Sequence, residues 1–143
     1  MADCLNYFSL ARKAGLLELG EEPVGAAARA GKARLIVVAQ DAGAHTVRRA
    51  ESFVSGTKQL LLRVPYTAAA LGGAVGRANL AVAAFTDHAL ALGFVKALPQ
   101  VPEQVVTALE SGAKRIAQRR QESAAHKRNV KSGHTRKPVQ NKQ

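Results

Sequence analysis

The chain of 143 residues is predicted to be an α/β protein, with a small sheet enclosed between layers of helices. Segments that suit strands alternate along the sequence with segments that suit helices, which is the pattern of such a sandwich. The run 35–39 is continuously apolar and rich in β-branched residues, as expected of a strand covered on both faces. The alternation stops near Pro99 and Pro102, because two prolines so close together interrupt regular structure.

The expected elements begin and end at residues with known capping preferences. Pro23 suits a first helical turn, Thr67 and Asp87 suit N-caps, and Gly15 and Gly31 suit helix ends. In order, we expect a helix between Asp3 and Gly15, a strand over 17–19, a helix over 24–30, a strand over 35–39, a helix over 45–54, a strand over 60–64, a short helix over 67–71, a strand over 80–85 and a helix from Asp87 to Leu98.

Three regions follow from this order. Residues 1–98 form the predicted folded domain, and 99–122 form a linker and an amphipathic basic helix. That helix carries an apolar stripe of Val105, Leu109, Gly112 and Ile116. Residues 123–143 have too little apolar surface to fold and are predicted to be a disordered basic tail.

The charge of the chain indicates its class of partner. The net charge is +11 and the pI is near 10.6. Residues 1–100 contribute 11 − 7 = +4 and residues 101–143 contribute 10 − 3 = +7. Such a surplus favours a polyanion, usually nucleic acid, although a charged tail can also serve only for solubility. No apolar run is long enough for a membrane span, and no membrane partner is expected.

The chemistry of catalysis is not indicated by the sequence. No acid/base pair, nucleophile motif or metal-ligand spacing stands out, so we expect no catalytic residue, metal, cofactor or small-molecule substrate. The glycine-rich segment 72–76 does not follow a strand and suits a turn with positive φ better than a phosphate loop. Asp41 and Asp87 suit helix caps better than catalytic acids. Cys4 is the single cysteine, and we expect a cytoplasmic location.

The stretch 17–31 is the candidate functional element. It is predicted to be a short strand, a turn at Gly20 and a helix whose first turn holds Glu21 and Glu22. A helix N-terminus presents unpaired backbone N–H donors, and a glycine beside it allows another molecule to approach closely. We expect this turn to face RNA, and the alternative is an ordinary capped helix.

Five motifs in order carry a resemblance to a known family. They lie at 10–15, 20–22, 31–41, 71–77 and 81–87, where the last reads Ala-Val-Ala-Ala-Phe-Thr-Asp. Over residues 3–98 the chain resembles the kink-turn RNA-binding ribosomal superfamily of archaeal ribosomal protein L-seven-A-e and eukaryotic L-thirty-e, and most closely its bacterial YlxQ-like branch. The resemblance implies a three-layer α/β/α fold with a four-stranded mixed sheet.

The resemblance also implies where RNA binds. In the family, the turn corresponding to Gly20 and the loop corresponding to 76–80 together hold a kinked internal loop, and the loop packs on an extruded base. The family's Asn, Glu and Lys fall on Glu22, Pro23 and Ala26, so its base- and phosphate-reading residues are all changed here. The expected RNA-binding residues are Arg12, Lys13, Gly20, Glu21, Glu22, Arg29, Lys32, Arg77, Ala78, Asn79 and Leu80, with Arg and Lys contacting phosphate.

Two hypotheses follow. The first is a non-enzymatic RNA-binding protein associated with the ribosome or another structured RNA and helped by its basic tail. The second is an adaptor of the translation or transcription machinery on the same fold, in which the helix over Val105–Ile116 docks a partner protein.

Overall fold

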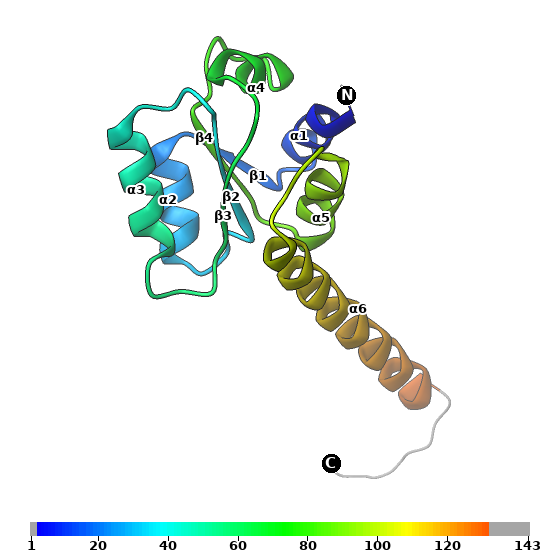
Figure 1. Ribbon diagram of the computed structural model, residues 1–143. Helices are drawn as coiled ribbons and strands as arrows, with labels where there is room; N and C mark the ends of the chain where they lie inside the picture. Colours follow the sequence, from blue (N-terminus) through cyan, green and yellow to red (C-terminus); the bar gives the residue numbers. More distant parts are fainter. Residues whose placement is uncertain (1–2, 132–143) are drawn as a thin grey trace. The chain divides into compact units, whose positions relative to one another are not determined.

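The computed structural model describes residues 3–131, which contain six helices and four strands (Figure 1). The elements are α1 (Asp3–Lys13), β1 (Leu17–Leu19), α2 (Glu21–Arg29), β2 (Leu35–Val38), α3 (Ala44–Val54), β3 (Leu61–Arg63), α4 (Ala68–Ala74), β4 (Val82–Phe85), α5 (His88–Ala97) and α6 (Glu103–Lys131).

The four strands form one mixed sheet in the order β1-β4-β2-β3. The strands β1 and β2 both pair antiparallel with β4, while β2 and β3 are parallel. The central strands β2 and β4 are buried at every residue, as expected for strands covered on both faces. The predicted α/β class and the mixed four-stranded sheet are therefore confirmed.

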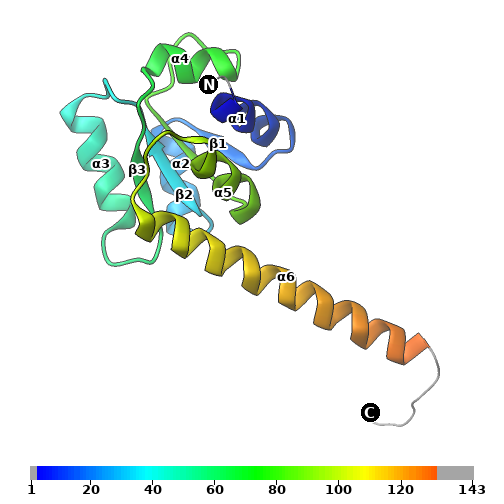
Figure 2. The same ribbon diagram turned by 45° about the vertical axis from the view of Figure 1, so that its right-hand side comes forward.

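Helices cover both faces of the sheet (Figures 1 and 2). On one face, α2 and α3 bury a small cluster that includes Val24 and Ile36. On the other face, α1, α4 and α5 close a larger cluster. Its centre is three mutually packed rings, Phe8, Phe85 and Phe94, whose centroids lie 5.2–5.4 Å apart. With few aromatics in the chain, these rings fill the space between the sheet and α1 and α5.

Two helix boundaries differ from the sequence prediction. α2 begins at Glu21 and not at Val24, because Pro23 fits within a first turn that starts directly after Gly20. α4 is capped by Thr67, as predicted, but it continues to Ala74 and takes Gly72 and the next glycine into the helix. The start of α4 is fixed by a hydrogen bond in which the Ala70 N–H donates to Thr67 Oγ1 at 3.1 Å.

The packed unit reaches further along the chain than the two prolines suggest. It ends at Glu110, since Val105 and Leu109 in the first turns of α6 are buried in the larger cluster. The rest of α6 continues to Lys131, so the helix includes 123–131, the first part of the predicted basic tail. Ala, Lys and Arg are common in 123–131, which lack Gly and Pro, and such a composition supports a helix without a core. The predicted tail over 132–143 lies outside the described residues.

Candidate nucleic-acid interface

The Gly20 turn lies at one end of the sheet. The strand register places the ends of β1 and β2 beside the start of β4, with Leu19 opposite Ala83 and Val38 opposite Val82. The parallel strand β3 ends at the same side. The turn after β1 and the loop before β4 therefore meet at what we call the Gly20 end of the sheet.

Gly20 is both the N-cap of α2 and a conformational requirement. Its φ of 93° and ψ of 165° lie in a region that only glycine occupies readily. Its N–H donates to the Val82 carbonyl at 3.0 Å, and its carbonyl accepts from the Val24 N–H at 3.1 Å. No side chain caps this helix start, so the first N–H groups of α2 remain directed at the outside of the molecule.

The loop 76–80 is held beside this turn by a close backbone contact. A Cβ built on Gly72 of α4 would lie 2.7 Å from the Arg77 carbonyl oxygen and 3.0 Å from the Asn79 Cα. The Gly72 carbonyl also accepts the Arg77 N–H at 2.8 Å, and Gly76 has the predicted positive φ, 77°. Gly72 thus allows the backbone of Arg77 and Asn79 to pass close to α4. The sequence prediction of a turn with positive φ did not assign this role to it.

The two segments that the resemblance paired are adjacent in the structure. The Arg77 guanidinium Nη1 lies 4.0 Å from the Cβ position of Gly20. Ala78 and Asn79, next in the loop, are exposed. A donor-rich helix start, a guanidinium and a small exposed loop are therefore gathered at one place, and all three are features that suit an RNA backbone and its bases.

Leu80 does not belong to this surface. It is only 2% exposed and packs in the larger core cluster, and its N–H donates to the Ala68 carbonyl at 2.8 Å. The expectation that Leu80 contacts RNA is wrong, because an apolar residue directly before a central strand is needed in the core. The exposed part of the loop ends at Asn79.

The two glutamates at the turn have different surroundings. Glu21 is held by α3, where its carboxylate pairs with Arg49 at 3.2 Å and accepts the Thr46 hydroxyl at 3.1 Å. Arg49 in turn lies over the Phe53 ring, 5.6 Å from its centroid. Glu22 is exposed on α2. The negative charge at the turn is therefore partly compensated, by residues of α3 that no local motif in the sequence could reveal.

The three positions that the resemblance aligns with RNA-reading residues face solvent. Glu22, Pro23 and Ala26 are all exposed. The helix face is thus available, although its residues are not those of the family.

Four of the predicted cations do not join the Gly20 turn. Arg12 and Lys13 end α1 and precede the start of β1, while Arg29 ends α2 and Lys32 follows it. A helix of nine residues rises about 13 Å, so Arg29 is separated from Gly20 by nearly the whole length of α2. The expectation that these four residues contact phosphate near the turn is wrong, because α2 and the direction of β1 place them at the opposite end of the sheet; their binding to RNA stays a prediction.

The other polar residues of interest have structural roles. Asp87 caps α5 by accepting the Leu90 N–H at 3.0 Å, and Asp41 accepts the Ala68 N–H at 2.8 Å at the start of α4. The capping prediction for Asp87 is confirmed. For Asp41 it is not, because α3, the helix that follows it, begins after Gly43 with no side-chain cap, and Asp41 binds the first N–H of α4 instead. The thiol of Cys4 and burial raise the pKa of Tyr66 to about 12, so this hydroxyl stays protonated. Within residues 3–131, no three His, Cys, Asp or Glu side chains are grouped to hold a metal ion.

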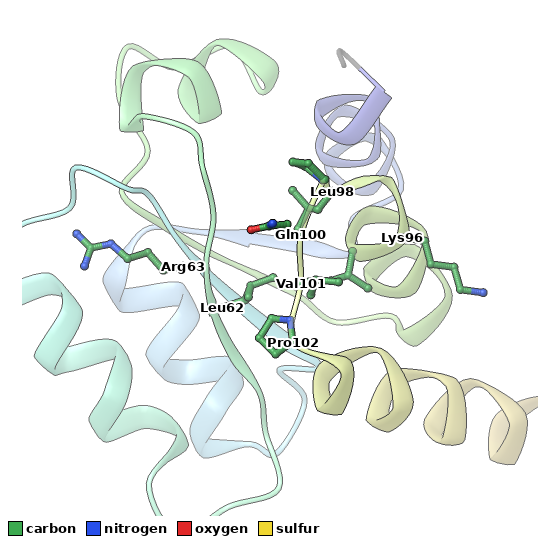
Figure 3. A pocket seen from close by; sticks show the side chains of 9 residues that line it. Leu62, Arg63, Lys96, Leu98, Gln100, Val101 and Pro102 are labelled. Carbon is green, nitrogen blue, oxygen red and sulfur yellow. The ribbon is translucent and has the colours of Figure 1, made fainter.

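A groove of about 760 Å³ lies between β3 and the segment after α5 (Figure 3). Leu62 and Val101 line it, while Arg63 and Lys96 extend in opposite directions at its sides (Figure 3). The charged groups do not converge on a common point. The groove therefore offers no catalytic arrangement, and the Gly20 end remains the candidate site.

Known proteins resemble this chain in fold and not detectably in sequence family. No family model and no curated protein matches the chain. A Bacillus halodurans protein of unknown function superimposes with a TM-score of 0.59 and 23% identity, over 77% of this chain and 99% of its own. The Giardia lamblia 15.5 kD RNA-binding protein superimposes with a TM-score of 0.58 and 20% identity, over 76% and 86%. The chain shares its fold with an RNA-binding protein. At these identities the likeness establishes the fold and nothing finer.

None of the helices within residues 3–131 is both long and apolar enough to cross a bilayer.

Proposed function

We propose that this protein is a non-enzymatic RNA-binding protein that holds a structured RNA at the Gly20 end of its sheet. The observation that carries the proposal is the juxtaposition of the Arg77 guanidinium, whose Nη1 lies 4.0 Å from the Cβ position of Gly20, and the uncapped start of α2 at that glycine. A guanidinium recognises phosphate in a bidentate manner, and a helix N-terminus favours an anion. Both groups therefore act on the same RNA backbone.

The shape of the RNA is the second part of the proposal. A helix start beside a small exposed loop, Ala78 and Asn79, admits a backbone that bends sharply and presents unstacked bases. Together with the shared fold, this arrangement supports membership of the kink-turn RNA-binding superfamily. A ribosomal or other structured RNA, in the cytoplasm, is the partner that we assign, and the basic C-terminal segment adds affinity that does not depend on sequence.

The adaptor hypothesis is weakened by the burial of part of its surface. It required the apolar stripe of α6 to be open to a partner, but two of the four residues of that stripe, Val105 and Leu109, are 8% and 1% exposed in the core of the domain. We therefore retain RNA binding as the single proposed function.

Fluorescence anisotropy with the full chain tests the proposal. The probe is a labelled RNA hairpin with a kink-turn internal loop, and the control is the same hairpin with the loop replaced by paired bases. We expect tighter binding of the kinked hairpin and a loss of that preference in Arg77→Gln. The matched control Arg48→Gln removes an exposed cation from α3 and should keep the preference. Equal affinity for the two hairpins would contradict the proposal.

A further inference from the structure

The two ends of the sheet differ in charge. The segments that meet at the Gly20 end are 19–22, 39–45, 63–67 and 75–81, which contain two cations, Arg63 and Arg77, and three carboxylates. The proposed RNA-reading turn is thus close to neutral, and the positive charge of the domain must lie elsewhere.

The opposite end of the sheet is strongly basic. The segments that meet there are 12–16, 29–34, 55–60 and 86–88, and they contain one carboxylate, Asp87, which caps α5. Their six cations are Arg12, Lys13, Arg29, Lys32, Arg34 and Lys58. We call these six residues the basic end. Five of them are exposed and Arg34 is half-buried, and within the described part of the chain none of the six forms an ion pair.

Hydrogen bonds hold the segments of the basic end together. Gln59 connects the loop before β3 to the end of α2, since its amide group donates to the Ala28 carbonyl at 3.0 Å and accepts the Ala33 N–H at 3.2 Å. The Thr86 N–H donates to the Leu16 carbonyl at 2.9 Å, which places the turn after α1 at the end of β4. The Arg34 N–H donates to the Phe85 carbonyl at 2.7 Å, beside it. The cations therefore come from three segments fixed at one end of one sheet.

Helix stabilisation explains only part of this surface. Cations in the last turn of a helix interact favourably with its dipole, which accounts for Arg12, Lys13 and Arg29. Lys32 and Lys58 are exposed in loops beyond the helices, where the dipole has little effect. Exposed cations without carboxylate partners are the footprint of a polyanion such as a nucleic acid backbone.

We infer that the basic end is a second RNA surface, which binds phosphates of a second RNA segment without regard to sequence. The inference rests on the proposed function of the Gly20 end, and it gives the domain two RNA surfaces on opposite ends of a sheet. One molecule then holds a kinked loop at the Gly20 end and a plain duplex at the basic end. The protein thereby brings two parts of a folded RNA together.

A two-colour experiment with the full chain tests this inference. The protein is mixed with a donor-labelled kink-turn hairpin and an acceptor-labelled 12-base-pair duplex, which is about one helical turn long. Energy transfer between the two labels reports that both RNAs are bound to one protein molecule. The triple variant Lys13→Gln, Lys32→Gln and Lys58→Gln removes one cation from each segment of the basic end. We expect it to show much weaker energy transfer, with the remainder due to the basic C-terminal segment, while it retains its affinity for the kinked hairpin.

A control triple separates a local effect from the loss of net charge. Arg48→Gln, Lys96→Gln and Lys114→Gln remove three exposed cations that lie outside the segments of both ends of the sheet. For binding of the plain duplex, the slope of log K against log salt should fall by about 2–3 in the basic-end triple, at roughly 0.9 per phosphate contact, and by no more than about 1 in the control. Circular dichroism spectra of both triples establish that they are folded.

The outcomes distinguish the two proposals. Binding of the kinked hairpin with no energy transfer, or an equal loss in both triples, would overturn the second surface alone. No binding of either RNA would overturn both proposals. The wild type could also sediment with anionic phosphatidylglycerol vesicles while the basic-end triple does not. If the triple then bound RNA as the wild type does, the basic end would be a lipid-binding surface and the inference would be overturned.

Discussion

Replacing Gly72 with alanine tests how the loop beside Gly20 is held. The new Cβ would lie 2.7 Å from the Arg77 carbonyl oxygen, so this backbone must retreat by about 0.7 Å to reach an ordinary contact of 3.4 Å. Backbone atoms on both sides prevent relief by a rotamer change. Overpacking of this kind costs about 1–3 kcal/mol, while alanine returns about 1 kcal/mol of helix propensity. The net effect is a destabilisation of up to about 2 kcal/mol.

The adjacent glycine provides a matched control. Gly73 lies in the same helix, is exposed and has nothing within 4 Å of its Cβ position. Gly73→Ala should therefore stabilise the protein by roughly 0.5–1 kcal/mol. Urea denaturation followed by circular dichroism at a helical wavelength measures both variants, and the two free energies of unfolding should differ by about 1–3 kcal/mol.

The same pair of variants tests the role of the loop in binding. Displacement of Arg77 in Gly72→Ala should weaken binding of the kinked hairpin, whereas Gly73→Ala should leave it unchanged. Equal stability and equal RNA binding in the two variants would show that the close backbone contact at Gly72 does not hold the loop.

Three further variants test single residues at or near the interface. Gly20→Ala should cost about 1–3 kcal/mol in urea denaturation because of its φ of 93°, and a change below about 0.5 kcal/mol would contradict a glycine requirement. Arg49→Ala should change the free energy of unfolding by less than about 1 kcal/mol, because its ion pair with Glu21 is partly exposed. It should weaken RNA binding in anisotropy by leaving the Glu21 carboxylate uncompensated, and unchanged binding would show that the ion pair does not affect RNA binding. Asp87→Ala should lower the free energy of unfolding by about 1 kcal/mol through loss of the bond to the Leu90 N–H, with Asp87→Asn retaining most of it, and equal losses in the two variants would argue against capping.

Most of the fold could be predicted because local sequence signals agree with one another. The apolar run 35–39 defines the central strand β2, and Thr67 and Asp87 cap the helices that were expected to follow them. Each of these signals acts within a few residues, so it does not depend on the rest of the fold.

The site could be predicted only in part, because the strand register decides which residues come together at each end of the sheet. Gly20 and Arg77 are adjacent only because β1 and β4 pair antiparallel with their relevant ends together. The same register carries Arg12 and Lys32 to the other end of the sheet. Charge counts along the sequence cannot distinguish these two destinations.

Tertiary contacts also explain the roles that were missed. The sequence predicts that Gly72 ends a helix, but in the structure it lies within α4 and packs against the backbone of Arg77 and Asn79. Arg49 resembles any exposed helical cation until Glu21 is placed beside it. The polarity of the stretch after residue 122 predicts a segment without a core, while its content of Ala, Lys and Arg favours the helix that continues to Lys131.

The most direct test of RNA binding at the Gly20 end is a nuclear magnetic resonance titration of the ¹⁵N-labelled full chain with the kink-turn hairpin. We expect the largest amide shifts at residues 20–22 and 77–79, with smaller shifts at the basic end until the plain duplex is added. Shifts absent from both the Gly20 turn and the loop 77–79, in a chain that nevertheless binds the hairpin, would contradict RNA binding at the Gly20 end.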